Sequence, residues 1–199
     1  MNNWLESFLP VLAQALQLPV TLGLLAGAAM TVVYLGGFCA EAWSRWRYSG
    51  EFHRLIARLK RGSGTTLQLE GIRFGFPARV LLEFSQTPAA VDKILDDAQL
   101  ATERALGKLH FGVRLGPMLG LAGTLIPLGP ALRTLGNSDF NNLGEQLIVS
   151  FSSTVVGLFI GALCFVMYAI RQRWYTQDLN DLEFVARTLI KPQEAQLVE

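Results

Sequence analysis

The sequence predicts an all-α integral membrane protein with three transmembrane helices, two of which extend into the cytoplasm. Three long stretches, residues 7–40, 115–132 and 146–170, contain no Asp, Glu, Lys, Arg or His, while the segments between them are richly charged. A helix needs about 20 mainly apolar residues to cross the hydrocarbon core of a bilayer. The overall composition hides this pattern, because hydrophobic residues make up 51% of the chain and the formal net charge is only +1. The distribution of charge therefore indicates the membrane spans.

The basic residues are distributed unevenly, and their positions predict the orientation. None of the 17 Lys and Arg residues precedes residue 43, and twelve lie between Arg45 and Arg114. Basic segments next to membrane spans stay on the cytoplasmic side. We therefore expect an inner-membrane protein whose N-terminus and 135–145 loop face outside, with the C-terminus in the cytoplasm.

The first 42 residues predict a surface helix followed by the first span. Apolar residues recur there at helical spacing: Trp4, Phe8, Val11, Leu12 and Ala15. Residues 1–18 are therefore expected to form an amphipathic helix on the outer surface. Pro19 suits a helix start, and the first transmembrane helix is expected over residues 19–42. Gly23 and Gly27 give it a small face for ordinary helix packing.

The next section, residues 43–111, is expected to be cytoplasmic and mainly helical. An interfacial belt marks its beginning: Trp43, Arg45, Trp46, Arg47 and Tyr48. The pattern over residues 62–86 favours no single structure. Thr87 and Pro88 make a good helix start, and the apolar residues after them keep a helical period. A single long helix is therefore expected to run from the cytoplasm into the second span.

The second span, expected over residues 112–134, is rich in glycine and proline. Between Arg114 and Arg133 its only polar side chain is Thr124. Such a sequence makes a poor helix in water but is tolerated among packed membrane helices, where glycine permits close approach. The candidates for close packing are Gly116, Gly120 and Gly123.

The third span, expected over residues 146–170, has two contrasting faces. Small and hydroxylated residues share one face: Ser150, Ser153, Thr154, Gly157 and Gly161. Bulky residues share the other: Phe151, Val155, Leu158, Phe159, Ala162, Phe165 and Val166. The bulky face suits lipid, and the small face suits protein or water. The short 135–145 loop makes the second and third spans antiparallel neighbours. Residues 171–199 are expected to form an amphipathic cytoplasmic helix that ends before Pro192.

The small faces also predict an obligate oligomer, because small residues permit close packing against another helix and give no such benefit against lipid. The spans contain hydroxyl groups but no carboxylate that could take up and release a proton. Because acidic groups inside a membrane are costly and therefore few, a conducting path would need its ionisable carrier from another protein.

Two motifs in these spans resemble the paired signature of the MotA/TolQ/ExbB proton-channel family. They are Pro117-Met-Leu-Gly-Leu-Ala-Gly-Thr124 in the second span and Ser153-Thr154-Val-Val-Gly157-Leu158 in the third. The order of the spans agrees as well, and the resemblance is strongest from about residue 104 to 175. It implies an ion-channel subunit, for protons first of all, of an energy-transducing membrane motor. Five such subunits would surround a dimer of an ExbD/TolR/MotB-like single-span protein with a membrane aspartate, and ion flow would drive mechanical work.

The resemblance also implies site residues. Thr124 and Thr154 match the family's pore-lining threonines, and Ser150 and Ser153 join them as candidate ion-pathway residues. One position departs from the pattern. The TolQ and ExbB branches commonly carry a glutamate five residues before the third-span threonine, where this chain has Val149. This departure leaves the route and the identity of the ion open. The nearest glutamate, Glu145, lies nine residues before Thr154, near the outer mouth.

Two other classes of function compete with a channel. In a non-conducting helical membrane scaffold, Thr124, Ser150 and Thr154 would hydrogen-bond helices together, for about 0.6 kcal/mol each. An intramembrane enzyme is disfavoured, because no His, Lys or Asp lies in the spans to activate a nucleophile. We expect no catalytic residue, no cofactor and no nucleic-acid partner. Cys39 and Cys164 are too few for a disulfide framework or a metal site.

Overall fold

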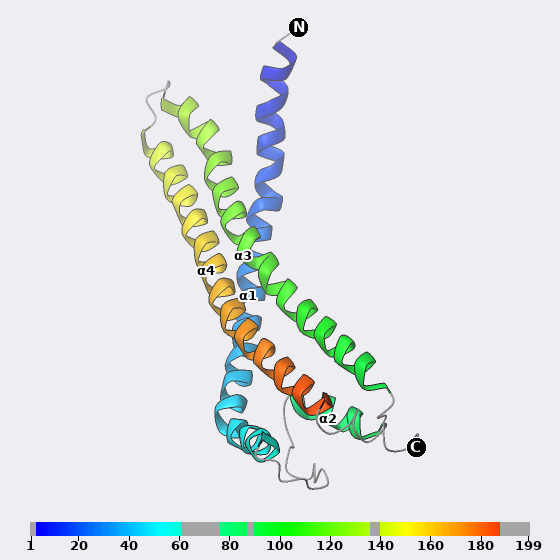
Figure 1. Ribbon diagram of the computed structural model, residues 1–199. Coiled ribbons are helices and arrows are strands. Elements are labelled where there is room, and N and C mark those ends of the chain that lie inside the picture. Colours follow the sequence, from blue (N-terminus) through cyan, green and yellow to red (C-terminus); the bar gives the residue numbers. More distant parts are fainter. Residues whose placement is uncertain (1–2, 61–75, 87–89, 136–139, 188–199) are drawn as a thin grey trace. The chain divides into compact units, whose positions relative to one another are not determined.

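The computed structural model describes residues 3–60, 76–86, 90–135 and 140–187, which form four α-helices and no strand (Figure 1). The helices are α1 (Asn3–Lys60), α2 (Phe76–Gln86), α3 (Val91–Leu135) and α4 (Phe140–Val185). Three of them, α1, α3 and α4, are long and apolar enough to cross a membrane. The predicted all-α membrane fold with three spanning helices is therefore confirmed.

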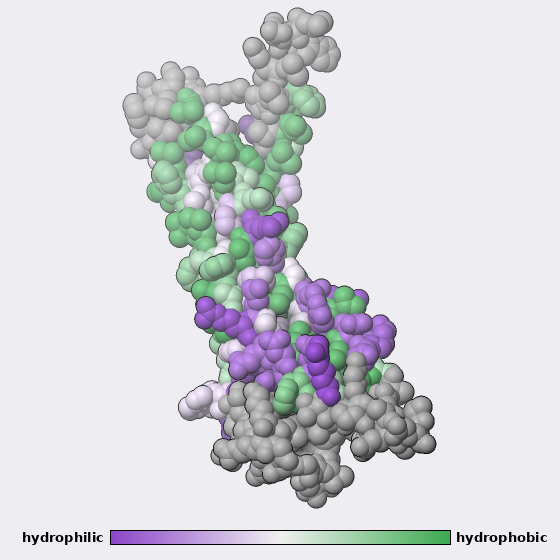
Figure 2. All heavy atoms as spheres, in the orientation of Figure 1, coloured by the Kyte–Doolittle hydropathy of each residue, from purple (hydrophilic) through white to green (hydrophobic). Residues whose placement is uncertain are grey.

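The chain divides into two compact units. The first, called here the spanning unit, comprises residues 1–36 and 108–168, and the second, the polar unit, comprises residues 37–107 and 169–199. In Figure 2 apolar residues dominate the visible face of the spanning unit, and hydrophilic residues are frequent on that of the polar unit. Helices α1, α3 and α4 contribute to both units.

In the spanning unit, one face of α1 packs on α3 and α4. This face consists of small or slender residues: Gly23, Leu24, Gly27 and Thr31. Leu119 and Ile160 occupy the space beside the two glycines, at 3.4 Å and 3.7 Å from the positions that added Cβ atoms would take. The Thr31 hydroxyl lies 3.8 Å from the sulfur of Cys164. The small face of the first span therefore packs within the chain.

Helix α1 runs without interruption past Pro19. The sequence predicted a separate helix before this proline, and the structure instead has one helix of 58 residues. Proline is tolerated inside membrane helices because neighbouring helices and local adjustments compensate for the lost backbone hydrogen bond. The outer-surface position of residues 1–18 stays a prediction.

The polar unit has an apolar core to which α2, α3 and α4 all contribute. Its buried members are Val80, Leu81, Phe84, Val91, Ala98, Leu182, Val185 and Ala186. Helix α2 lies in the section where the sequence pattern favoured no structure, and its core residues follow helical spacing. The Thr87–Pro88 helix start and the predicted helix end near Pro192 lie outside the described residues.

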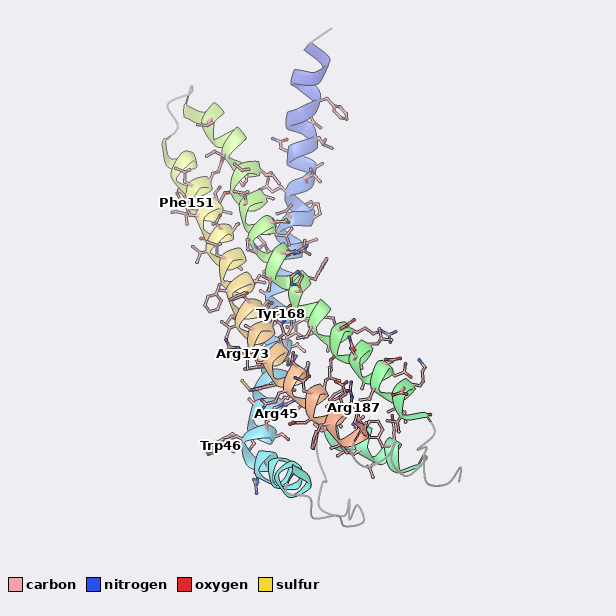
Figure 3. The ribbon with its side chains drawn as sticks, viewed as in Figure 1. Arg45, Trp46, Phe151, Tyr168, Arg173 and Arg187 are labelled. Atoms are coloured by element: carbon pink, nitrogen blue, oxygen red, sulfur yellow. The ribbon has the colours of Figure 1, made fainter. Side chains whose placement is uncertain are left out.

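Trp43 and Trp46, which the sequence analysis placed in an interfacial belt, are highly exposed. Their exposed fractions are 65% and 81%, and their rings meet edge to face with centroids 6.1 Å apart. Trp46 projects away from the helices of the polar unit (Figure 3). Indole rings at the end of an apolar stretch are typical of the membrane–water boundary.

Candidate ion-pathway residues and the glycine seam

Helices α3 and α4 meet along a line of glycines in the spanning unit, which we call the glycine seam. A Cβ atom on Gly157 would lie 2.5 Å from the carbonyl oxygen of Gly116 and 2.6 Å from Cα of Gly120. Both neighbours are backbone atoms, so no side chain could move aside. Only glycine permits this approach, because carbon atoms normally stay about 3.5–4.0 Å apart.

The seam continues along both helices on either side of this central contact. Added Cβ atoms would lie 2.7 Å from Ser153 Cβ at Gly123 and 2.8 Å from Pro117 Cδ at Gly161. The five glycines that the sequence marked for packing therefore all lie at the contact between α3 and α4. Because the two small faces contact each other within one chain, they give no reason by themselves to expect an oligomer.

The two candidate threonines are half-buried, and each hydroxyl donates to a backbone carbonyl. Thr154 Oγ1 donates across the seam to the carbonyl oxygen of Gly120 at 3.2 Å. Thr124 Oγ1 donates within its own helix to the carbonyl oxygen of Leu121 at 2.8 Å. The structure thus brings Thr154 to the seam but engages Thr124 with α3 itself.

The two serines behave in the same way. Ser150, only 3% exposed, donates to the carbonyl oxygen of Gln146 at 2.8 Å, and Ser153 donates to that of Val149 at 3.0 Å. A hydroxyl has one hydrogen to donate and two lone pairs that can accept. With their hydrogens engaged by the backbone, all four candidate hydroxyls present only acceptor capacity.

Gln146 belongs with these residues, although it is not among the ion-pathway residues predicted from the sequence. Its side-chain oxygen Oε1 is fully buried and has no hydrogen-bond partner among the described residues. Gln146, Ser150, Ser153 and Thr154 form one line along α4, which we call the acceptor row. The signal was present in the sequence, because Gln146 precedes Ser150 by one helical turn.

The polar unit contains a different concave feature, a groove of about 600 Å³ between α3 and α4. Four carboxylates line it: Asp92, Asp96, Glu103 and Glu183. Its lining includes no histidine, cysteine, serine or lysine. In the described parts of the chain, no group of three His, Cys, Asp or Glu residues is placed to hold a metal ion. The acceptor row is therefore the stronger candidate site.

Comparison with known proteins places these residues in a family. Residues 78–183, more than half of the chain, match the MotA/TolQ/ExbB proton channel family. The chain belongs to this family. A protein of Methanothermobacter thermautotrophicus, described as a candidate biopolymer transport protein and ExbB homolog, is 24% identical over 119 residues. These residues cover 59% of this chain and 41% of that relative, so the chain spans less than half of the relative's length.

The matched region of this MotA/TolQ/ExbB family member contains the whole glycine seam and the whole acceptor row. The family consists of channel subunits and is not a class of enzymes. Val149, which stands where related branches commonly carry a glutamate, is 57% exposed in the isolated chain. Glu145 is exposed as well. In this member buried side-chain oxygens at that end of α4 belong to Gln146 and Ser150.

Helix α1, which lies outside the matched region, is joined to α4 in the polar unit by an ion cluster. Both terminal nitrogens of Arg45 donate to the carboxylate of Asp178, whose side chain is only 10% exposed. The carboxylate of Glu41 forms ion pairs with Nε of Arg45 at 3.4 Å and with Nε of Arg171 at 2.9 Å. The pair with Arg171 does not have the geometry of a hydrogen bond. The guanidinium of Arg45 also lies 5.0 Å from the ring centre of Trp174.

Burial dominates the electrostatics of Asp178 in this cluster. It raises the pKa of Asp178 above its usual range, although the hydrogen bonds and charge of Arg45 act in the opposite direction. The loss of hydration at Asp178 is thus larger than the gain from its partner. The cluster holds α1 and α4 together in the polar unit, directly after the uncharged stretches that end at residues 40 and 170.

Proposed function

We propose that this chain is the ion-channel-forming subunit of an energy-transducing membrane motor. In this proposal five copies surround a dimer of an ExbD/TolR/MotB-like single-span partner that carries a membrane aspartate. Ion flow, most naturally of protons, turns one part against the other. The chain would sit in the inner membrane with its N-terminus outside and its C-terminus in the cytoplasm.

The observation that carries the proposal is the acceptor-only character of the polar side chains in the spans. Each hydroxyl of Thr124, Ser150, Ser153 and Thr154 already donates to the backbone. Such oxygens can accept hydrogen bonds from hydrated protons or coordinate a metal cation, but they offer nothing to an anion. Selective cation pathways use neutral oxygen groups in the same way.

The exposure of these residues supports an assembly. Thr124, Ser153 and Thr154 are each partly exposed in the isolated chain. Oxygens with free lone pairs gain nothing from contact with hydrocarbon, whereas a watery path or a partner helix would use them. An oligomer that turns these residues toward a central partner satisfies them, and the bulky outer residues then face lipid.

The hydrogen bond from Thr154 to Gly120 also favours a second candidate function, the non-conducting scaffold. A threonine that links two helices has a structural role whether or not an ion passes it. The two functions differ in what happens when the hydroxyl is removed. A scaffold loses only about 0.6 kcal/mol of helix packing, whereas a channel loses a ligand on its path.

The test replaces Thr154 in complexes of the chain with its single-span partner, reconstituted in proteoliposomes. Thr154→Val keeps the size but removes the oxygen, so we expect normal assembly by native mass spectrometry with ion flux and coupled work strongly reduced. Thr154→Ser keeps the oxygen and should retain much of both. Thr124→Val should resemble Thr154→Val. A proton moving down 100 mV releases about 2.3 kcal/mol, so a blocked path stops the motor without unfolding it.

Two results would decide against the channel. If the Thr154→Val and Thr124→Val complexes assemble and conduct as the wild type does, structural hydrogen bonding explains both threonines. If the wild-type complex itself conducts no ion under an imposed gradient, the scaffold function is correct.

A further inference from the structure

We propose that Gln146 is the first cation ligand of the ion pathway, at the end of the acceptor row that the predicted topology places outside. The ligand is a monovalent cation, either a hydrated proton or Na⁺, since both are bound by neutral oxygen acceptors. The inference rests on the proposed channel function and adds to it a site and a direction of access.

The state of the Gln146 side chain is the first observation. Its Oε1 atom is buried and unpaired within the described part of the chain. A buried acceptor without a partner costs about 1–3 kcal/mol, and native proteins rarely leave one unsatisfied. A leucine or methionine at this position would avoid that cost. A donor or cation from outside the described residues would satisfy the amide oxygen.

The position of Gln146 in the acceptor row is the second observation. Ser150 donates to the backbone carbonyl of Gln146 itself, and Ser153 and Thr154 follow on the next turns. Eight residues of helix rise about 12 Å, so the row runs that distance from Gln146 to Thr154. Oxygen acceptors thus follow one another along α4 without a large gap.

The row of oxygen acceptors ends at Thr154. Beyond Thr154, residues 155–167 contain no hydroxyl, amide or charged side chain. Gly157 and Gly161 are pressed against α3 there, and Cys164 fills the space beside Gly112, 2.7 Å from where a Cβ would lie. A cation therefore enters along the Gln146 end and meets Thr154 last, which makes Gln146 the first ligand.

The chemistry of an amide also fits the presence of Val149 where related branches commonly carry a glutamate. A carboxylate could bind a proton and hold it, whereas the amide oxygen can only accept a hydrogen bond or coordinate a cation. Val149 is exposed and apolar, and one turn before it Gln146 provides a buried oxygen without a partner among the described residues. The amide oxygen would pass on a hydrated proton or Na⁺ without itself becoming protonated.

The test compares flux through wild-type and variant complexes with the single-span partner in proteoliposomes. One arm imposes a proton gradient with a pH-sensitive dye, and the other imposes a Na⁺ gradient with a sodium-sensitive dye. Gln146→Met keeps the length and removes the oxygen, and we expect about a tenfold loss of flux with the native mass unchanged. The matched control is Gln177→Met, the same substitution at an exposed position of the polar unit, which should leave flux within about twofold of wild type.

The outcomes separate this inference from the proposed function. Wild-type flux in neither arm would refute the channel itself. Wild-type flux with an equal flux in Gln146→Met would refute the ligand role of Gln146 and leave the channel standing. Failure of Gln146→Met to assemble would show that the amide is structural, which also overturns the inference. A loss in one arm alone identifies the cation as the proton or as Na⁺.

Discussion

Replacing Gly157 with alanine tests whether the glycine seam is a contact within one chain. The added Cβ would lie 2.5 Å from the carbonyl oxygen of Gly116 and 2.6 Å from Cα of Gly120. Since contacts between carbon atoms are best at about 3.5–4.0 Å, α3 and α4 would have to separate by roughly 1 Å. The Thr154–Gly120 hydrogen bond, already 3.2 Å long, would then break.

The expected loss of stability follows from three contributions. Overpacking costs about 1–3 kcal/mol. Losing the hydrogen bond costs about 0.6 kcal/mol more. Alanine gains about 1 kcal/mol over glycine in a helix. The net expectation is a destabilisation of about 1–2.5 kcal/mol.

Gly129 provides a matched control in α3, because nothing lies within 4 Å of the position that its Cβ would take. Gly129→Ala should be neutral or stabilise by up to about 1 kcal/mol. The assay is unfolding of the detergent-purified protein by increasing SDS, followed by circular dichroism at the helical band. The free energies of unfolding of the two variants should differ by about 1–3.5 kcal/mol, with Gly157→Ala the less stable.

Two results would refute the reasoning. If Gly157→Ala unfolds at the same SDS fraction as Gly129→Ala, the backbone contact at the seam does not exist in the membrane helices. If the loss in Gly157→Ala depends on protein concentration, the seam joins different copies, because a contact within one chain is independent of concentration.

Two further predictions concern the topology and the polar unit. In a background without the exposed Cys39, Ser138→Cys and Gln177→Cys should be labelled by an impermeant thiol reagent from opposite sides of the membrane, outside and inside respectively; labelling of both from one side would contradict the three-span topology. Arg45→Met leaves the buried carboxylate of Asp178 unpaired and should destabilise by about 2–4 kcal/mol, whereas adding Asp178→Leu should recover most of this loss. Thermal unfolding measures both, and simply additive losses would contradict the pairing.

Periodicity was sufficient to predict the faces of the membrane helices. The bulky residues of the third span are exposed in the chain, as Phe151 and Val155 show with exposed fractions of 65% and 66%. Phe151 lies on the side of α4 away from α3 (Figure 3). The small residues of the same helix lie at the seam. A period of 3.6 residues assigns each side chain to a face whatever covers that face.

The partner of each face could not be predicted, because a pattern within one helix carries no information about its neighbour. Glycines permit close approach between helices of different copies of the chain as well as between α3 and α4 of one copy, so the glycine pattern does not distinguish the two contacts. Likewise, the Arg45–Asp178 pair joins residues 133 positions apart, and nothing near either residue in the sequence marks the other. The spacing of Gln146 from Ser150 could have placed it on the same face of α4, but its unpaired oxygen is a property of the fold and could not be predicted.

The division of chemistry between the chain and its proposed partner follows from the acceptor row. Oxygens whose hydrogens are engaged by the backbone can stabilise a cation at several points, but none of them changes its own charge. A motor needs one group whose charge changes as the ion arrives, because only such a change can alter the forces between the moving parts. No side chain in residues 146–170 or 115–132 can do this at neutral pH. The chain is therefore suited to deliver the ion, and a membrane carboxylate on another protein is suited to convert its arrival into movement.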